Sequence, residues 1–400
     1  MWQRIVWPIC CVSFVFATFS EGQAQAPAET RRISHDNSQT IETGSTDVLT
    51  AAQWQRVDDS VDRALEWLAG QQQRDGSFPT LPQGQPGVTS LCVMAFMAHG
   101  HLPGEGPFGV HLTKSIQYIH RCQHSSGLLA VIAPRGTTIS RSVNFKVGST
   151  AAYNHAISAL LLAEAFAVGG SRKADEARLT IEKAIEATLE MQNWEKSAAD
   201  AGGWRYLDRH DDFDSDLSLT GWQLMFLRSA KNAGFDVSQE PIDDAVSYVQ
   251  RCFHQRAGSF NYAAIKANKC TRAMAGAGVL ALAHAGKHDL PEARAAGRWI
   301  LEHHFHHYND IDAASTGDGR HDRYHYGLFN CCQAMYQLGG DYWSSYFPPA
   351  VGVLLDSQRP DGSWPAEDYS RDRPYGNAYT TSLVVLALGA PNQLLPVFQR

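Results

Sequence analysis

The sequence predicts an all-α fold in which six helical hairpins close into a ring, an α/α toroid (α6/α6 barrel). Three observations lead to this prediction. A short phrase ending in glycine and an aromatic residue recurs along the chain, amphipathic segments alternate with segments that are apolar on nearly every side, and the two clearest phrases stand far apart, near the two ends. An all-round apolar helix must be buried, whereas an amphipathic helix can cover it and face water. Hairpins with one helix of each kind therefore build an inner and an outer circle.

The N-terminal region predicts export. Arg4 precedes an apolar run over residues 5–19, and residues 24–26 have the small-x-small form of a signal-peptidase site. We therefore expect a signal peptide over 1–26, a flexible polar lead-in over 27–50 and a single toroid domain over 51–400, in a protein exported to the periplasm or the extracellular space. The alternative is a membrane anchor, but the run is short for a span. No later segment is apolar enough, so we expect no stable membrane span.

The recurring phrase consists of an apolar pair, a glutamine, a glycine and a final aromatic residue. It is written "WLAGQQQRDGSF" at 67–78 and "VLLDSQRPDGSW" at 353–364. Fainter copies start at Tyr118, Leu189, Tyr248 and Trp299; the copy at Leu189 carries a longer insertion, and the last copy has lost its glutamine and glycine. Glycine can adopt φ > 0 where a helix ends, and a glutamine amide can bond the backbone groups freed there. The phrase itself thus predicts a structural turn.

A second segment follows each phrase, rich in alanine and leucine and in most cases ending at glycine, a usual helix stop. These expected inner helices cover residues 88–100, 151–170, 218–234, 271–286, 326–340 and 379–390. The expected outer helices, such as 57–72 and 177–192, carry charge on one face. An open solenoid is the alternative, and the well-preserved phrases near both ends favour closure.

Composition excludes several function classes. The net charge is −7 and no basic run reverses it, so we expect no nucleic-acid partner, which would need a basic face. Six cysteines follow the signal peptide without any C-x-x-C pair; no disulfide pairing follows from them, and Cys92, Cys331 and Cys332 stand in apolar text as core thiols. HEXXH, a glycine-rich phosphate loop and a GxSxG elbow are absent. We expect no cofactor and no metal.

The phrases "QRPDGSW" and "QQRDGSF" resemble the QW motif of the prenyltransferase and squalene-oxidase repeat family. Terpenoid cyclases, such as squalene–hopene cyclase, and protein prenyltransferase β subunits share this repeat. The resemblance extends over about residues 57–388. It implies a six-hairpin α/α toroid that holds a polyprenyl substrate in a central cavity.

The resemblance also implies a proton donor in a DxDD motif at the start of an inner helix. The most similar segment here is "DDFDSDLSLTGWQ", in which Asp214 and Asp216 occupy the first and third positions of the motif and Leu217 occupies the fourth. Protein prenyltransferases instead hold zinc with Asp, Cys and His. Cys270 and His325 stand at inner-helix starts, but two ligands do not make a zinc site.

In such a ring, the N-terminal ends of the inner helices line one mouth, and their free N–H groups suit polar ligand groups. Polar and aromatic residues gather at these positions. The candidate catalytic residues are Asp214 and Asp216, and the candidate substrate-binding residues are His155, Thr220, Arg272, Tyr324, His325, Tyr326 and Tyr379. The plainer interpretations are helix capping for the aspartates and wall packing for the others. Arg205 and Tyr206 in "GGWRYLDR" are also expected near a mouth.

The segment "EHHFHHYNDID" at 302–312 is the strongest local signal for a metal, because His303 and His307 are spaced i, i+4, as are His306 and Asp310. The plainer interpretation is a solvated helix end, and we favour it.

Three functions remain open. The first expectation is a terpenoid-cyclase-like protein that binds or transforms an isoprenoid or other apolar ligand. The alternatives are a secreted polysaccharide lyase or hydrolase, since one pectate-lyase family carries a turn resembling "QRPDGSWP", and a non-catalytic interaction scaffold. The expected partner is an apolar small molecule or a glycan; the sequence identifies no protein partner.

Overall fold

The computed structural model describes residues 48–141, 143–169, 174–209, 212–265, 270–311, 322–367 and 372–399. Twelve α-helices lie in these ranges and alternate between two circles. The outer helices are α1 (Ala51–Gln71), α3 (Gly109–Arg121), α5 (Ala174–Gln192), α7 (Glu240–Arg251), α9 (Pro291–Glu302) and α11 (Gly340–Ser357). The inner helices are α2 (Gly87–Met97), α4 (Phe145–Val168), α6 (Leu217–Asn232), α8 (Arg272–His284), α10 (Tyr324–Leu338) and α12 (Gly376–Leu388).

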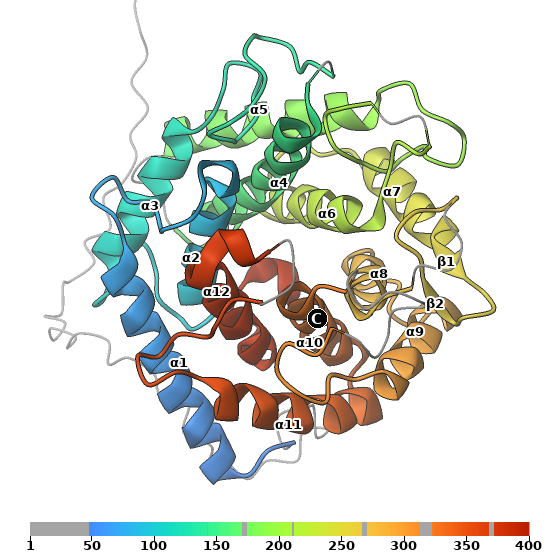
Figure 1. Ribbon diagram of the computed structural model, residues 1–400. Helices are drawn as coiled ribbons and strands as arrows, with labels where there is room; N and C mark the ends of the chain where they lie inside the picture. Colours follow the sequence, from blue (N-terminus) through green and yellow to red (C-terminus); the bar gives the residue numbers. More distant parts are fainter. Residues whose placement is uncertain are drawn as a thin grey trace, which may run out of the picture. The chain divides into compact units, whose positions relative to one another are not determined.

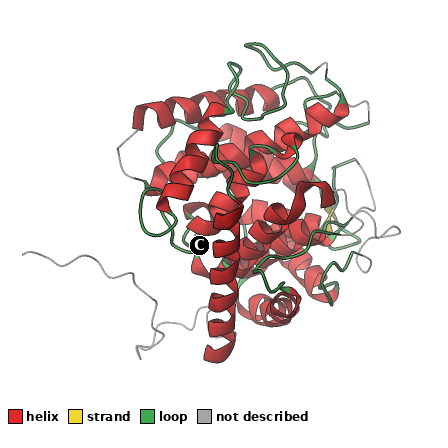
Figure 2. Cartoon of the chain, turned by 60° about the vertical axis from the view of Figure 1, so that its left-hand side comes forward, coloured by secondary structure: helices red, strands yellow, loops and turns green. Residues whose placement is uncertain are grey.

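The helices of residues 48–399 form a closed ring (Figure 1). Each inner helix packs on the next, and α12 packs on α2, while α11 packs on α1 in the outer circle. The predicted six-hairpin α/α toroid is therefore confirmed. Strand is limited, in the part of the chain described, to the antiparallel pair β1 (Phe253–His254) and β2 (Ser259–Phe260) between α7 and α8 (Figure 2).

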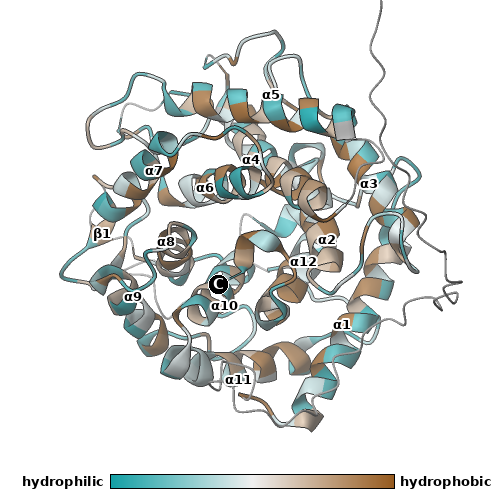
Figure 3. Cartoon of the chain, turned by 180° about the vertical axis from the view of Figure 1, so that it is seen from behind, coloured by the Kyte–Doolittle hydropathy of each residue, from teal (hydrophilic) through white to brown (hydrophobic). Residues whose placement is uncertain are grey.

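Hydropathy separates the two circles as the sequence analysis expected (Figure 3). Every residue of α2 is buried, and so is nearly every residue of α8. The outer helix α7 buries only one face, through Ile242, Val246 and Val249 among others. Burial of apolar surface, at about 25 cal/mol per Å², therefore fixes which helix of each hairpin lies inside.

The turn phrases tie neighbouring hairpins together. The Gln72 amide donates to the carbonyl of Gly76 at 3.4 Å and to that of His111 in α3 at 2.8 Å. The equivalent Gln358 amide donates to the carbonyl of Gly362 at 2.9 Å and to that of Ser60 in α1 at 2.8 Å. The second turn thus fastens the last hairpin to the first.

Glycine is required in these turns for a steric reason. Gly362 has φ of +92°, and a Cβ on it would lie 2.4 Å from the carbonyl oxygen of Arg63 in α1. Gly76, Gly127 and Gly202 likewise have positive φ and approach a backbone carbonyl of the next outer helix equally closely. The glycine therefore lets adjacent hairpins touch backbone to backbone.

The C-terminal segment closes the ring at the C-terminal ends of the inner helices, near the centre of Figure 1. It contains two short 3₁₀ turns, η4 (Ala390–Asn392) and η5 (Pro396–Phe398). The Phe398 ring lies 6.0 Å from that of Phe329 in α10, and the Phe398 carbonyl accepts from the Gln337 amide at 2.6 Å. Phe329 in turn stacks on Trp222 of α6 at 5.6 Å. Aromatic side chains therefore fill the axis on this side.

The predicted signal peptide and most of the lead-in lie outside the described residues, so those predictions stay open. Among the described residues just before α1, Leu49 is buried and the Thr50 hydroxyl caps the helix. One described helix, α4, is long and apolar enough to span a membrane by composition, but 72% of that stretch is buried inside the protein. It is a core helix of the ring.

Candidate functional site

The mouth at the N-terminal ends of the inner helices gathers charged and phenolic side chains. Asp216 precedes α6 and caps it, since its Oδ1 accepts from the backbone N–H of Leu219 at 2.9 Å. Its Oδ2 accepts from Arg205 Nη1 at 3.1 Å. The capping interpretation of Asp216 is thus confirmed, and the residue is fully buried at the start of α6.

Two opposing effects act on this carboxyl. Burial raises the pKa of Asp216 above its ordinary value, while Arg205 and the backbone N–H groups lower it. The Arg205 guanidinium lies over the rings of Phe213 at 3.9 Å and Tyr206 at 4.5 Å. The pair is therefore held in a largely apolar frame, where its charges act strongly on neighbouring groups.

Half-buried tyrosines surround the Asp216–Arg205 pair. The Tyr153 hydroxyl donates to Ser218 Oγ at 2.9 Å, and Ser218 donates to the Tyr326 hydroxyl at 3.0 Å. The Tyr206 and Tyr262 hydroxyls lie 2.9 Å apart. Burial raises the pKa of each of these phenols, so they stay protonated at neutral pH and serve as hydrogen-bonding groups. Together with Tyr379 we call them the mouth tyrosines.

A second arginine–aspartate pair lies at the same mouth. Arg323, just before α10, forms an ion pair with Asp372, and the Tyr379 hydroxyl lies 3.5 Å from Asp372 Oδ2. Burial raises the pKa of Asp372, Arg323 lowers it, and the nearby carboxylate of Glu367 raises it further. Electrostatic interaction between Arg323 and Tyr153 links this pair to the first cluster.

His325 belongs to a buried chain behind this second pair. Its Nδ1 lies 3.0 Å from Glu367 Oε1, and its Nε2 lies 2.6 Å from the Tyr308 hydroxyl. The Tyr308 hydroxyl donates to the Pro365 carbonyl at 2.7 Å, so its oxygen is left to accept from Nε2–H. The chain fixes the loop before α12 against α10.

Four other predicted site residues lie inside the ring wall. Arg272 is fully buried between Asp322 at 2.7 Å and Asp310 at 3.4 Å. Tyr324 is also fully buried, and its ring packs on those of Phe305 and Tyr308. These contacts match wall packing.

His155 and Thr220 also lie in the wall, where each accepts a hydrogen bond from a backbone N–H group of a turn. His155 Nδ1 accepts from the Leu129 backbone N–H at 3.2 Å, and its Nε2 bonds Thr188 at 2.9 Å. Burial lowers the pKa of His155 to about 4, so the ring is neutral. The Thr220 hydroxyl accepts from the Trp204 backbone N–H at 3.0 Å.

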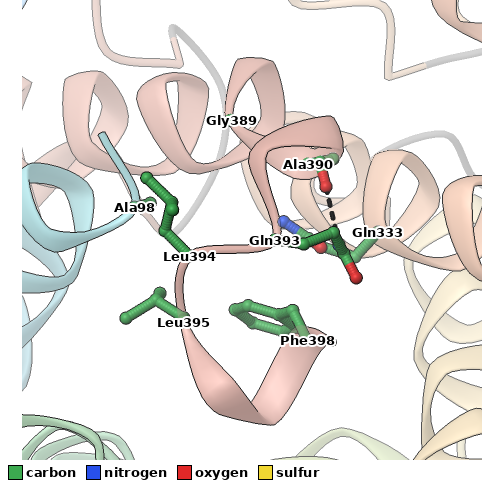
Figure 4. Close-up of a pocket in the computed structure, with 8 residues that line it drawn as sticks. All are labelled: Ala98, Gln333, Gly389, Ala390, Gln393, Leu394, Leu395 and Phe398. Carbon is green, nitrogen blue, oxygen red and sulfur yellow. Dashed lines mark hydrogen bonds between the residues drawn. The ribbon is translucent and has the colours of Figure 1, made fainter. Parts of the chain in front are cut away.

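Asp214 lies apart from Asp216. It forms an ion pair with Arg141 and lines an open cleft of about 640 Å³, which is formed by the connection between α5 and α6 together with Ile265. The two aspartates of the DxDD-like text therefore face different surroundings. A second cavity lies at the other end of the ring, beneath the C-terminal segment (Figure 4). Its volume is about 10 Å³, room for a single water molecule.

The described residues hold no group of three or more His, Cys, Asp or Glu that could bind a metal ion. His303 stacks on Trp299 at 4.1 Å, and Asp310 accepts from the His306 backbone N–H at 2.9 Å. The predicted segment's end, Asp312, lies outside the described residues. Cys270 hydrogen-bonds Asn261 and does not join His325. The six described cysteines are free thiols.

The sequence analysis missed several residues of the mouth, namely Tyr262, Arg323, Glu367 and Asp372. The available signal was their position, because each lies in the stretch between a turn phrase and the start of an inner helix, as Asp216 does. Such stretches carry no period, so their residues do not stand out in the sequence.

No family model and no curated protein matches the chain. Among solved structures it is similar to the type II terpene cyclase MstE from Scytonema, with a TM-score of 0.53, 15% identity, and coverage of 85% of this chain and 100% of that one. A glycosidase variant has a TM-score of 0.53 at 12% identity, covering 87% and 100% of the two chains. A D-mannose isomerase has a TM-score of 0.59 at 14% identity, covering 87% and 99%. At these identities the likeness is one of fold, a toroid shared by enzymes of different chemistry.

Proposed function

We propose that the chain binds a carbohydrate at the mouth, and that Asp216 and Asp372 are the groups that exchange protons with it. The observation that carries the proposal is the convergence of the mouth tyrosines around two arginine–aspartate pairs, the buried pair Arg205–Asp216 and the partly exposed pair Arg323–Asp372. The ring supplies these groups from several hairpins, and their side chains interact with one another.

Tyrosine suits a sugar because its flat ring packs on C–H groups while its hydroxyl hydrogen-bonds. Arginine donates in a fixed fork and a carboxylate accepts, so the two pairs match a ligand whose hydroxyls both donate and accept. An isoprenoid chain offers no such partners. Covering each phenol or carboxyl tip with hydrocarbon would cost about 1–3 kcal/mol where a hydrogen bond to water is lost.

The two carboxyls also have the electrostatic setting that acid–base chemistry needs. Burial raises the pKa of both Asp216 and Asp372, which brings a carboxyl closer to the range where it can give and take protons near neutrality. Two of the similar structures, the glycosidase and the D-mannose isomerase, are sugar enzymes by name, and this agrees with the proposal.

A second candidate is transformation of an isoprenoid. It is favoured by the position of Asp216, a buried carboxyl that opens inner helix α6 at the third place of a DxDD-like text. The similar terpene cyclase agrees with it. On this view the repeat would belong to the QW-motif family, as the turn phrases suggest.

Calorimetric titration distinguishes the two. The purified protein is titrated with neutral mono- and oligosaccharides, and separately with squalene and geranylgeranyl diphosphate in detergent micelles. We expect saturable binding of at least one saccharide. Binding of only the isoprenoids would replace the first candidate by the second, and the absence of any binding would overturn both.

A phenol-to-phenyl change locates the ligand. Tyr206→Phe removes one mouth hydroxyl and keeps the ring, and should weaken saccharide binding about two- to tenfold, the loss of one hydrogen bond. Tyr342→Phe is the matched control, since Tyr342 lies in outer helix α11 and its hydroxyl bonds Arg294 and Arg298 of α9. Equal effects of the two changes would argue against a ligand at the mouth.

We also propose that the protein acts outside the cytoplasm, on the strength of the signal-like residues 1–26. The intact mass of the protein recovered after expression tests this, because removal of these residues shortens the chain by a defined amount. A full-length mass in the cytoplasmic fraction would contradict export.

A further inference from the structure

The cleft that Asp214 lines has unused hydrogen-bonding groups of its own. Asp214 and Asp200 are both more than nine-tenths buried, and in each the Oδ1 atom has no hydrogen-bond partner among the described residues. Their Oδ2 atoms are occupied, in Asp200 by the Ser197 hydroxyl at 2.8 Å and in Asp214 by Arg141. A carboxylate oxygen only accepts, so the missing groups are donors.

The charges around these two oxygens favour a ligand that offers a neutral hydrogen-bond donor over one that offers a cation. Lys196 lines the same cleft and interacts electrostatically with both Asp214 and Asp200. Its Nζ donates to the Gln192 carbonyl at 3.2 Å and contacts the Gly203 carbonyl. A ligand cation would meet this ammonium. The buried Arg141 Nε is a donor without a partner among the described residues. A hydroxyl can serve both kinds of group, because it donates and accepts.

The cleft adjoins the mouth through a shared wall. Phe213 lines the cleft, and its ring carries the Arg205 guanidinium at 3.9 Å and meets the Tyr262 ring at 6.1 Å. Arg205 and Tyr262 belong to the mouth. Ile265, three residues after Tyr262 in the same loop, lines the cleft, and half of its surface is exposed. The Phe213 ring is thus common to both places, and a ligand that reaches from the mouth into the cleft has to pass over it. The cleft volume of about 640 Å³ is within the range of about 300–1,000 Å³ common for ligand sites.

We infer that the Asp200–Asp214 cleft is a second subsite, which takes a further sugar unit of the ligand bound at the mouth, so that the ligand is an oligosaccharide. This inference rests on the proposed function. The mouth holds one unit against the tyrosines, and the cleft takes another beside Asp200 and Asp214, whose unpaired Oδ1 atoms are covered in the free protein and accept its hydroxyls once the lining side chains move aside.

Chain length provides the first test, and it needs no variant. The affinities of a mono-, di- and tetrasaccharide of the same sugar are compared by calorimetry on the unaltered protein. We expect the tetrasaccharide to bind at least tenfold more tightly than the monosaccharide. Equal affinities would overturn the second subsite and leave the proposed function standing, whereas no binding of any saccharide would overturn both.

Side-chain changes then locate the gain. The double variant Asp200→Asn with Asp214→Asn should lose most of the tetrasaccharide's advantage, about five- to tenfold, and leave monosaccharide affinity unchanged. Asp356→Asn, at a largely exposed side chain far along the sequence in α11, controls for the loss of charge.

Hydrogen exchange on the unaltered protein is the second measurement, should the double variant not fold. The tetrasaccharide, and not the monosaccharide, should protect residues 195–200. Equal losses for both sugars in the double variant, or no added protection by the tetrasaccharide, would show that the cleft is not a subsite.

Discussion

Glu164 near the end of α4 holds the C-terminal segment through a fully buried carboxyl. Its Oε1 accepts from the Ser229 hydroxyl at 2.5 Å, and its Oε2 accepts from the Val397 backbone N–H at 3.2 Å. Burial raises the pKa of Glu164 from 4.5 to about 7, against the smaller lowering effect of the two hydrogen bonds. The titration of Glu164 should therefore make its own contribution to the pH dependence of the stability of the ring.

The sign follows from proton linkage. Well below pH 4.5 the carboxyl is protonated in both the folded and the unfolded chain. Its titration therefore does not affect the free energy of unfolding there. Between pH 4.5 and about 7 the unfolded chain loses its proton first, so stability falls as pH rises, and the loss levels off above the folded pKa. A shift from 4.5 to about 7 corresponds to about 3 kcal/mol at about 1.4 kcal/mol per unit.

Glu164→Gln removes this titration without removing the contacts. The glutamine carbonyl can still accept from the Val397 N–H, and the Ser229 hydroxyl can turn to accept from the amide. Urea unfolding at pH 5, 6, 7 and 8, followed by circular dichroism, measures the free energy of unfolding of both proteins. The advantage of the variant over the natural chain should grow by about 2 kcal/mol from pH 5 to pH 8.

An exposed carboxyl supplies the control. Glu66→Gln changes the net charge by the same amount at an exposed position of α1, and its comparison with the natural chain subtracts any general effect of charge. A difference between Glu164→Gln and the natural chain that stays constant across this pH range would refute the reasoning. It would mean that the carboxyl is ionised throughout, held so by its two donors.

Three further outcomes are expected. Gly362→Ala should lower the free energy of unfolding by more than about 2 kcal/mol, because the new Cβ would lie 2.4 Å from a carbonyl oxygen of α1 and φ is +92°. The control is Gly352→Ala, inside α11 with open space around it. This variant should leave stability unchanged or raise it by up to about 1 kcal/mol. Equal melting temperatures for these two variants would contradict the steric account. Both Asp216→Asn and Asp216→Ala remove the carboxylate that pairs with Arg205, but only the alanine variant also loses the α6 cap, about 1 kcal/mol, so it should lower the melting temperature more. Equal drops for the two variants would show that the charge alone matters. Addition of EDTA should leave the melting temperature unchanged, and a drop would point to a metal held at the histidines of 303–310.

The fold could be predicted because its determinants are local in the sequence. Whether a helix is apolar all round or on one face is written within about four turns, and this alone assigned inner and outer positions. The turn glycines and glutamines also act locally. Cys92, Cys331 and Cys332, expected as core thiols, are buried because they stand in the same apolar helical text.

The candidate site was predictable only in part. Asp216, Tyr326 and Tyr379 lie at the mouth, as their place at inner-helix starts suggested. Arg272 and Tyr324 start inner helices too, yet they are buried in the wall, because the direction of a side chain depends on which neighbouring helix it meets. His155 was expected near a helix start, but α4 begins at Phe145, so this residue lies in the middle of the helix. The sequence could not supply that neighbour.

By itself, then, the amino-acid sequence determined the class of fold, the number of hairpins and the turn that joins them, since periodicity and turn chemistry are properties of short segments. Only the tertiary structure decided which polar residues share a site. Arg205 and Arg323 are separated by more than a hundred residues in the sequence, yet ring closure brings both to one mouth. Asp214 and Asp216 are separated by a single residue, yet they lie in different surroundings because α6 starts at Leu217. Distance in space depends on how the helices pack, and packing is settled by the whole ring at once.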